Sequence, residues 1–290
     1  MYTYTFKPVK GYWFTKYLLE KLKEARGCIE ITLDIGISTK RVLVERGVLL
    51  IDDYSIKIND VMPSSYDRVV LYEPSGRVYE VVRACPKGFY KLKVVEAKTA
   101  PTLEISGIHM HRITGITPWK DSELKVRKLK ISPGDTVLDT CLGLGYTAIH
   151  SLIRGARNVY SVEIDENVLW IAERNPWSHR LVNNNIMIYR GDVTDAVKKF
   201  DTESFDKILH DPPRYTSSTG ALYGIEFYRE LYRVLKPGGR LYHYTGEPRK
   251  HSAPSIVKGI GERLRRAGFY PVLYDHRTLG YIAFKPRKSI

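Results

Sequence analysis

The stretch KILHDPPRYTSS, residues 207–218, places a carboxylate where an apolar run stops. Pro212 and Pro213 cannot donate ladder hydrogen bonds, so the predicted strand ends before them and Asp211 lies at its tip. The prolines also fix φ near roughly −65°, which removes flexibility from the backbone after Asp211. A carboxylate and the Pro212 carbonyl held in this way can accept both N–H hydrogens of an amino group and stabilise positive charge on its nitrogen.

The segment that must position this carboxylate alternates strands with helices. Strands are predicted in DTVLDT, NVYSVEI, IMIYRGD, FDKILHD and RLYHYTG, with helical stretches such as GIEFYRELYRVL between them. The last runs, FYPVLYD and LGYIAFKP, predict an antiparallel hairpin. Because such alternation gives a parallel sheet with right-handed crossovers, residues 106–290 predict a doubly wound, Rossmann-like α/β domain. Ligands of these sheets bind beyond the carboxyl ends of the strands.

Residues 1–105 follow a different pattern. A helix is predicted in FTKYLLEKLKEAR, and the runs after it, from CIEITLDI to FYKLKVVE, alternate apolar and polar residues between turn signals such as Pro86-Lys87-Gly88. This pattern predicts a small antiparallel β-rich domain. The aromatic and lysine residues of FKPVKGYWFTKY fit a packed small core better than a nucleic-acid surface, although both remain open.

A glycine-rich loop, VLDTCLGLGYTA, follows the first strand of the second domain. Asp139, Cys141, Gly143 and Gly145 stand at the spacing D-x-G-x-G-x-G, with cysteine in the first glycine position. Glycines in such a loop allow a tight turn and a close approach of the backbone to a ligand. One loop of this kind can also be an ordinary strand-to-helix turn, so the residues at the neighbouring strand ends decide between the two interpretations.

Acidic residues follow at the next two strand ends. Glu163, eighteen residues after Gly145, is placed to accept hydrogen bonds from both ribose hydroxyls of a nucleoside cofactor. Asp192 suits two roles equally, acceptor for an adenine amino group or cap of the following helix. With Asp211 at the fourth strand end, these residues predict one cofactor and substrate site along a single sheet edge.

These motifs resemble motifs I to IV of class I S-adenosylmethionine-dependent methyltransferases over roughly residues 110–290. Asp211-Pro212-Pro213 is similar to the [DNS]-P-P-[YFW] signature of enzymes that methylate exocyclic amino groups of bases. The whole chain resembles an archaeal group associated with cytidine N4 methylation in small-subunit ribosomal RNA. The resemblance implies S-adenosylmethionine as cofactor, Asp211 and Pro212 as catalytic groups, and RNA, naked or in a ribosomal particle, as substrate.

Two residues depart from the family pattern. Cys141 replaces the first loop glycine, which restricts the backbone there. Arg214 stands where the signature has an aromatic ring that would stack on the base. Pro213, Arg214 and Tyr215 are therefore candidate substrate residues, with Tyr215 supplying the ring or Arg214 stacking or gripping a phosphate.

Two further segments are candidates for substrate contact. His109, His111 and Arg112, before the first strand of the second domain, are expected to line the target pocket. Arg249 and Lys250 follow the fifth strand and suit backbone phosphates or a solvated loop equally well. No metal is expected, because the two histidines have no cysteine or acidic cluster beside them.

Composition favours a nucleic-acid partner. The formal net charge is +14, divided as +4 over residues 1–105 and +10 over residues 106–290. A basic surface attracts polyanions, so the β-rich domain is interpreted as an RNA-substrate platform. No apolar run suits a membrane span or a signal peptide, and the three cysteines form neither a disulfide framework nor a zinc motif, which together favour a cytoplasmic protein. The oligomeric state is not encoded in these patterns, and a monomer is favoured.

Two alternative activities remain open at this point. Within base methylation, guanosine N2 of transfer RNA is the main rival to cytidine N4. In a different class, the same fold transfers aminopropyl groups to polyamines. A polyamine pocket requires several carboxylates, whereas Arg214, Arg249 and Lys250 flank this site, so methylation is favoured. The target nucleotide and the number of methyl groups transferred are not encoded in these motifs.

Overall fold

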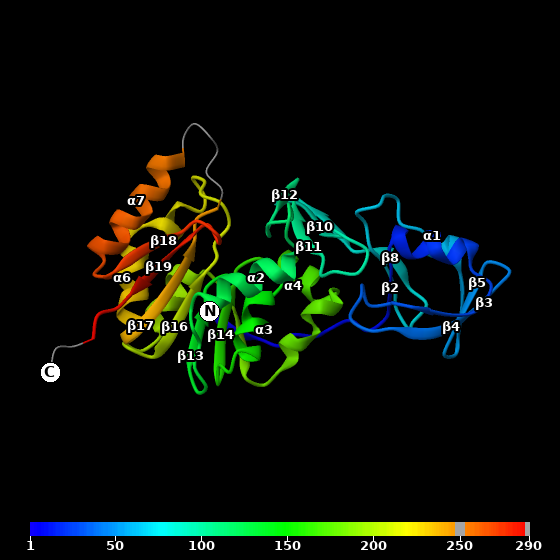
Figure 1. Ribbon diagram of the computed structural model, residues 1–290, viewed down its shortest axis with the longest axis horizontal. Helices are drawn as coiled ribbons and strands as arrows, with labels where there is room; N and C mark the ends of the chain where they lie inside the picture. The colour runs from blue at the N-terminus through cyan, green and yellow to red at the C-terminus, as the bar shows by residue number, and fades with distance from the viewer. Residues whose placement is uncertain (247–252, 288–290) are drawn as a thin grey trace. The chain divides into compact units, whose positions relative to one another are not determined.

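The computed structural model describes residues 1–246 and 253–287 (Figure 1). The chain divides into two compact units. The larger unit comprises Met1–Thr5, Asp121–Glu166 and Asn183–Ile290, and the smaller unit comprises Phe6–Lys120 and Asn167–Val182. The division near residue 120 lies after the predicted one at residues 105 and 106, because the last hairpin of the smaller unit continues beyond residue 105.

An eight-stranded sheet forms the larger unit, with strand order β1-β15-β14-β13-β16-β17-β19-β18. Its strands are β1 Tyr2–Tyr4, β13 Thr136–Asp139, β14 Asn158–Glu163, β15 Ile186–Arg190, β16 Phe205–His210, β17 Leu235–Tyr244, β18 Val272–Asp275 and β19 Gly280–Phe284. The five strands from β13 to β17 are parallel, and β18 and β19 form the predicted antiparallel hairpin. The predicted Rossmann-like fold is therefore confirmed.

Amphipathic helices pack on this sheet. They are α3 Tyr146–Ile153, α5 Val193–Ala196, α6 Ile225–Val234 and α7 Ala253–Arg266, with 3-10 turns η3 Val197–Lys199 and η4 Gly220–Tyr223. Helix α6 buries Phe227 and Leu231, which share one helix face at i and i+4. Helices α2 Pro118–Arg127 and α4 Glu166–Glu173 each span a division between the units.

The smaller unit is antiparallel and β-rich, as predicted. Its strands are β2 Tyr12–Phe14, β3 Gly27–Ile31, β4 Lys40–Glu45, β5 Val48–Ile51, β6 Tyr54–Lys57, β7 Val70–Tyr72, β8 Val78–Glu80, β9 Val82–Cys85, β10 Gly88–Lys93, β11 Thr102–Ile105 and β12 Ile108–His109, with the 3-10 turn η1 Ile58–Val61. They form three sheets, β2-β7-β8, β3-β4-β5-β6 and β9-β10-β11-β12. Helix α1, Lys16–Glu24, is capped by Thr15 and buries Leu19 and Leu22 against this core.

The segment 167–182, which includes the 3-10 turn η2 Pro176–Val182, belongs to the smaller unit through its own contacts. The indole N–H of Trp177 donates to the Ile35 carbonyl at 3.1 Å, and that of Trp13 donates to the Arg174 carbonyl at 2.7 Å. Trp170 carries the Arg174 guanidinium 3.8 Å from its ring centre. All four tryptophans of the chain lie in this unit, so tryptophan emission reports on it alone.

A charged network crosses the β10–β11 pair of the smaller unit. The Lys91 ammonium lies 2.7 Å from Asp67 and 2.8 Å from Glu104, and Lys93 lies 2.7 Å from Glu104. Burial opposes ionisation of Glu104 and Asp67, but hydrogen bonds from the lysines outweigh it and lower the pKa of both carboxyls to about 2.

We expect this network to stabilise the smaller unit only above acidic pH. The carboxyl pKa values lie below their unfolded values near about 4, so the stabilisation is present above that pH and disappears as pH falls toward about 2. Glu104→Gln should lower the denaturant midpoint of tryptophan emission strongly at pH 7 and much less at pH 2.5. The exposed Glu45→Gln serves as control. Equal effects of Glu104→Gln at both pH values would contradict the network's role.

Candidate active site

The predicted site residues gather at one edge of the large sheet. Asp139 is the last residue of β13 and Glu163 is the last residue of β14, while Asp211 directly follows β16. Because β13 pairs in parallel with both β14 and β16, these carboxyl ends face the same side. The edge lies where the strand order reverses, the place at which ligands bind in open α/β sheets.

Asp139 is fully buried at the start of the glycine-rich loop. Its Oδ2 accepts a hydrogen bond from the Thr147 hydroxyl at 2.9 Å. Its Oδ1 is buried without a hydrogen-bond partner among the described residues. The Ser161 side chain and the Cys141 backbone N–H act to lower the pKa of this carboxyl, so the cost of burying it is partly offset from within the chain.

The loop after Asp139 has the conformation that its glycines permit. Gly143 and Gly145 have φ values of 55° and 76°, in the left-handed region, and no atom lies within 4 Å of where a Gly143 Cβ would stand. Gly143 therefore presents backbone to open space. Cys141 does not have a positive φ, so cysteine in the first glycine position strains nothing. Burial raises the pKa of the Cys141 thiol, which leaves it a neutral, unreactive group.

Glu163 joins the second strand end to this loop. Its Oε2 accepts from the Gly143 N–H at 3.0 Å and its Oε1 accepts from the Asp165 N–H at 2.9 Å. These bonds fix the carboxylate plane while each oxygen keeps a second lone pair.

Asp192 caps helix α5, since its Oδ1 accepts from the Thr194 N–H at 2.8 Å. The cap interpretation of Asp192 is confirmed, and its contact with adenine stays a prediction.

These residues fit the S-adenosylmethionine that the sequence resemblance implies. Asp139 holds the start of the loop through Thr147, the Gly143 backbone allows close approach, and Glu163 suits the ribose hydroxyls. The cofactor would supply an electrophilic methyl group at this edge. The chain's own contribution would be to orient and bind it through carboxylates that burial has desolvated.

We expect cofactor affinity to rise with pH through neutrality. Burial raises the pKa of both Asp139 and Glu163 to about 7, so each is largely protonated at pH 6 and ionised at pH 8. Only the ionised carboxylates accept hydrogen bonds from a cofactor through both oxygens. The dissociation constant of S-adenosylmethionine, measured by calorimetry, should fall about tenfold or more between pH 6 and pH 8.

Two variants test the origin of this pH dependence. Glu163→Gln should reduce it to the part that Asp139 contributes, and Glu226→Gln, an exposed residue of α6, should leave it intact. A wild-type affinity that is equal at both pH values would show that neither buried carboxylate faces the cofactor.

A buried lysine holds the carboxylate of Asp211. The Lys125 ammonium, on helix α2, lies 2.8 Å from Asp211 Oδ2 and 3.1 Å from Asp121 Oδ2. Lys125 and Asp121 are fully buried, whereas the Asp211 side chain keeps 13% of its area exposed. The Tyr244 ring, at the end of β17, covers the ammonium with its centre at 3.8 Å.

The charges of this cluster, Asp121, Lys125 and Asp211, set its protonation state. Burial disfavours the ammonium, but the carboxylates of Asp211 and Asp121 outweigh burial and raise the pKa of Lys125 above its usual value. The lysine is therefore a permanent cation that fixes one oxygen of Asp211. The exposed part of that carboxylate is then presented to the sheet edge in one orientation.

The loop after Asp211 is anchored by its own hydrogen bonds. Pro212 is buried, and the Tyr223 hydroxyl donates to the Pro213 carbonyl at 2.7 Å. The Thr219 hydroxyl donates to the Arg214 carbonyl at 2.7 Å. Arg214 and Tyr215 project outward, and the Tyr215 ring is 52% exposed. Both remain available for the substrate contacts that the sequence predicts.

Two neutral histidines, His210 and His243, lie in the strands next to this loop. The ring of His210 accepts from the Thr140 hydroxyl at 2.7 Å and donates to the Leu222 carbonyl at 2.9 Å. Burial lowers the pKa of His210 to about 4 and that of His243 well below its usual value. The two rings lie 4.3 Å apart between β16 and β17. His210 thus ties the strand end to η4, which carries Tyr223.

The other predicted substrate residues belong to the smaller unit or lie outside the described residues. His109 contacts Lys93 and Glu104, each at 2.9 Å, and the His111 ring contacts the Thr102 hydroxyl at 2.9 Å, all within the smaller unit. Arg112 also belongs to that unit. The role of His109, His111 and Arg112 in the target pocket stays a prediction. Arg249 and Lys250 lie outside the described residues.

Sequence reasoning missed Lys125, Asp121, Tyr223 and Tyr244. The pair Asp121 and Lys125 has the i, i+4 spacing of a solvent-exposed helix ion pair, which hid its buried position. The apolar Leu129, four positions after Lys125, is a weak signal that this side of the segment is buried. Nothing in the sequence indicated which strand end the lysine would reach.

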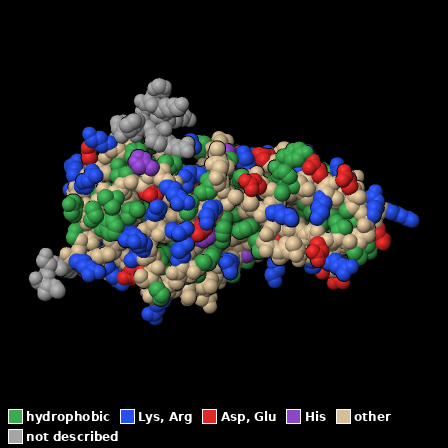
Figure 2. All heavy atoms as spheres, in the orientation of Figure 1, with side chains coloured by type: hydrophobic (Ala, Val, Ile, Leu, Met, Phe, Trp, Pro, Cys, Tyr) green, Lys and Arg blue, Asp and Glu red, His purple; other side chains and the backbone are tan. Residues whose placement is uncertain are grey.

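Metal and membrane criteria are not met in the described part of the chain. Among residues 1–246 and 253–287, no three His, Cys, Asp or Glu side chains are grouped as a metal site requires. No described helix combines the length and apolarity of a bilayer span. Figure 2 shows Lys and Arg side chains scattered over the visible face rather than gathered in one patch.

The chain is similar to several proteins. Residues 125–245 match the family model "Conserved hypothetical protein 95". The uncharacterized protein MJ1233 of Methanocaldococcus jannaschii is 47% identical over 201 residues, which cover 69% of this chain and 68% of that protein. Ribosomal RNA large subunit methyltransferase I of Aeromonas hydrophila is 29% identical over 123 residues, which cover 40% of this chain and 31% of that enzyme. The chain thus spans about a third of that second relative.

Structural comparison supports the fold. Spermidine synthase from Thermotoga maritima superposes with a TM-score of 0.54 over 77% of this chain and 80% of that one, at 16% identity, a level that speaks for the fold alone. The chain belongs to the family of the M. jannaschii protein MJ1233, and its larger unit has the Rossmann-like fold of class I methyltransferases.

Proposed function

We propose that this protein methylates an exocyclic amino group of an RNA base, and that the base is cytidine, at N4, in small-subunit ribosomal RNA. The observation that carries the proposal is the Asp211 carboxylate, fixed at the tip of β16 by the buried Lys125 and followed by the buried Pro212. The relative from A. hydrophila is named for its action on ribosomal RNA, which supports an RNA substrate.

The chemistry of an exocyclic amine suits this arrangement. Its nitrogen lone pair is delocalised into the base, so methylation builds positive charge on that nitrogen. Asp211 and the Pro212 carbonyl accept its two N–H hydrogens, orient the nitrogen and stabilise the developing charge. Asp211, directly or through water, then takes the proton that the nitrogen releases. Lys125 keeps the carboxylate in place through these changes.

The substrate base must reach Asp211 unstacked, because an amino group inside a helix is inaccessible. Tyr215, 52% exposed and 5.4 Å from the Tyr223 ring, supplies the stacking surface in place of the ring that Arg214 replaces. The smaller unit serves as the RNA platform, and Arg249 and Lys250 bind phosphates. The formal charge of +14 supports polyanion binding by the chain as a whole.

Nucleoside mass spectrometry tests the proposal. Small-subunit ribosomal RNA from cells lacking the protein is incubated with the purified chain and S-adenosylmethionine, digested and analysed. The expected product is N4-methylated cytidine, with one or two methyl groups. A methylated guanosine N2 would identify the base assignment as wrong and leave the amine chemistry standing. Absence of any methylated nucleoside from both naked RNA and small ribosomal subunits would overturn the proposal.

The cofactor that the protein prefers distinguishes methyl transfer from aminopropyl transfer. The protein is expected to gain thermal stability with S-adenosylmethionine at lower concentrations than with its decarboxylated form, because a ligand stabilises the folded protein according to its affinity and a methyltransferase uses the carboxylated form. Tighter binding of the decarboxylated form would favour polyamine chemistry instead.

A further inference from the structure

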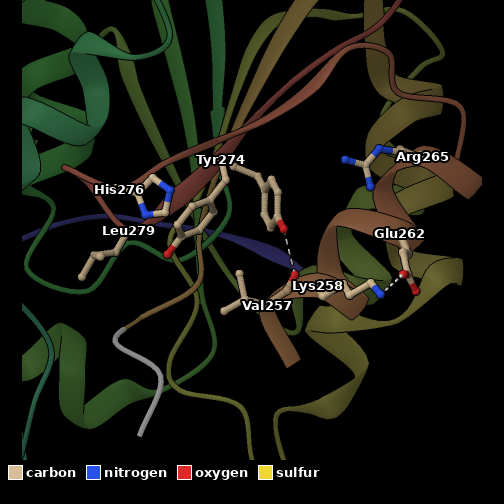
Figure 3. A pocket seen from close by; sticks show the side chains of 8 residues that line it. Val257, Lys258, Glu262, Arg265, Tyr274, His276 and Leu279 are labelled. Atoms are coloured by element: carbon tan, nitrogen blue, oxygen red, sulfur yellow. Dashed lines mark hydrogen bonds and ion pairs between the residues drawn. The ribbon is translucent and has the colours of Figure 1, made fainter. Parts of the chain in front are cut away.

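A hollow opens beside the candidate active site. It encloses about 670 Å³ between helix α7 and the β18–β19 hairpin (Figure 3). Helix α7 contributes four of the lining residues and the hairpin contributes the rest. The lining residues are Val257, Lys258, Glu262, Arg265, Tyr274, His276, Leu279 and Tyr281.

This hollow lies at the same sheet edge as Asp211. The turn of the hairpin is held to the end of β17, because the Thr245 N–H donates to the Leu279 carbonyl at 3.0 Å. The neighbouring residue, Tyr244, pairs with Gly280 and covers the ammonium of Lys125. Strand β17 therefore lies between β16, which ends just before Asp211, and β19, which lines the hollow, and its backbone is paired with both strands.

Its wall toward the hairpin is aromatic. The rings of Tyr274 and His276 lie 4.9 Å apart, edge to face, and His276 is exposed at the rim. Tyr281 closes the floor, where its hydroxyl donates to the Val257 carbonyl at 3.0 Å. A Cβ at Gly261 would lie 2.7 Å from that hydroxyl, so the glycine is what lets the tyrosine pack against α7.

Its wall toward α7 is cationic. Lys258 and Arg265 stand at i and i+7 on one helix face, about 10 Å apart along the axis, with Glu262 between them. The Lys258 ammonium and the Glu262 carboxylate are 3.9 Å apart and are 80% and 55% exposed, so this ion pair is weak and easily exchanged. Figure 3 shows these side chains on the side opposite the two hairpin rings.

We propose that this hollow is a subsite for a nucleotide next to the methylated one in single-stranded RNA. Aromatic rings that stack on bases and cations that contact phosphates are the recurring elements of single-strand recognition. An acidic peptide would use the cations but leave the rings without a role. The inference rests on the proposed function, since it assumes an RNA substrate. In this proposal, residues of β18, β19 and α7 select the RNA sequence next to the target nucleotide.

The test compares matched variants of the full chain for binding to a 20-nucleotide cytidine-containing single-stranded RNA over a range of salt concentrations. Lys258→Ala with Arg265→Ala should weaken binding and lower the slope of log affinity against log salt by about 1.4, or about 0.7 for each phosphate that is no longer neutralised. His276→Ala should weaken binding about tenfold without changing the slope. Glu262→Gln should tighten binding, because it removes the acid from between the two cations.

Two controls keep charge and ring effects apart. Arg266→Ala removes an exposed cation from the same helix outside the hollow, and Tyr270→Ala removes a ring that is 73% exposed and lines no part of it. The subsite would be overturned if Arg266→Ala lowered the salt slope by half as much as the double variant, because each cation would then contribute equally whether or not it lines the hollow. RNA binding that is unchanged both in His276→Ala and in the double variant would also overturn the subsite. If the wild-type chain binds no RNA at low salt, the proposed function fails as well, and the two failures are thereby distinguished.

Discussion

Asp211→Ala is expected to lower the rate of methyl transfer by about 10²- to 10³-fold while S-adenosylmethionine still binds. The carboxylate accepts an N–H of the substrate amine and meets positive charge that exists only as the methyl group is transferred, so its loss acts on turnover. The cofactor residues Asp139 and Glu163 lie on other strands and keep their contacts. Single-turnover rates with saturating RNA, together with calorimetric cofactor affinity, measure the two effects separately.

An aspartate outside the site provides the control. Asp201→Ala, at an exposed turn before β16, should leave both the rate and the affinity unchanged. A rate for Asp211→Ala within threefold of wild type would mean that the methyl acceptor is oriented by other groups. Cofactor affinity that falls in parallel with the rate would place Asp211 at the cofactor instead.

Lys125→Met is expected to destabilise the larger unit by about 3–5 kcal/mol and to abolish activity. Methionine matches the length of the aliphatic chain, but it leaves the buried Asp121 carboxylate without its cation and releases Asp211. Removing one partner of a buried ion pair carries this cost because the remaining charge stays desolvated. Chemical denaturation followed by far-ultraviolet circular dichroism at pH 7 measures the loss.

Two further variants identify the loss of the lysine's positive charge as the cause. Lys198→Met breaks an exposed pair with Asp195 and should cost less than about 1 kcal/mol. Adding Asp121→Asn to Lys125→Met removes one of the two carboxylates that the lysine had neutralised and should restore part of the stability. A double variant as unstable as Lys125→Met alone would trace the cost to packing against Tyr244 rather than to charge.

The larger unit could be predicted well because its signals are local. Strand and helix periods, the glycine loop, and the acids at successive strand ends each occupy a few neighbouring residues, and the parallel topology brings those ends together. Asp211 stands out for the same reason, since the prolines beside it indicate where the strand stops. The order of strands then follows from the family resemblance rather than from any single pattern.

What supports Asp211 could not be predicted, because it is assembled from distant parts of the chain. Lys125 meets a carboxylate 86 residues away, and Tyr223 meets a carbonyl whose position depends on the loop between them. Periodicity distinguishes buried from exposed helix faces, yet a lysine on a buried face is indistinguishable in sequence from one that reaches water. Similarly, the His210 and His243 pair becomes evident only once β16 and β17 lie side by side.

The pairing of strand β1 also affects how the chain can fold and be divided into fragments. Tyr2–Tyr4 pairs with β15, whose residues are translated about 180 positions later, and the chain passes between the units at residues 5/6, 120/121, 166/167 and 182/183. Strand β1 can therefore pair only after β15 has been synthesised. Neither unit corresponds to one uninterrupted piece of gene, so a fragment beginning at residue 106 would leave the β15 edge bare and prone to pairing between molecules.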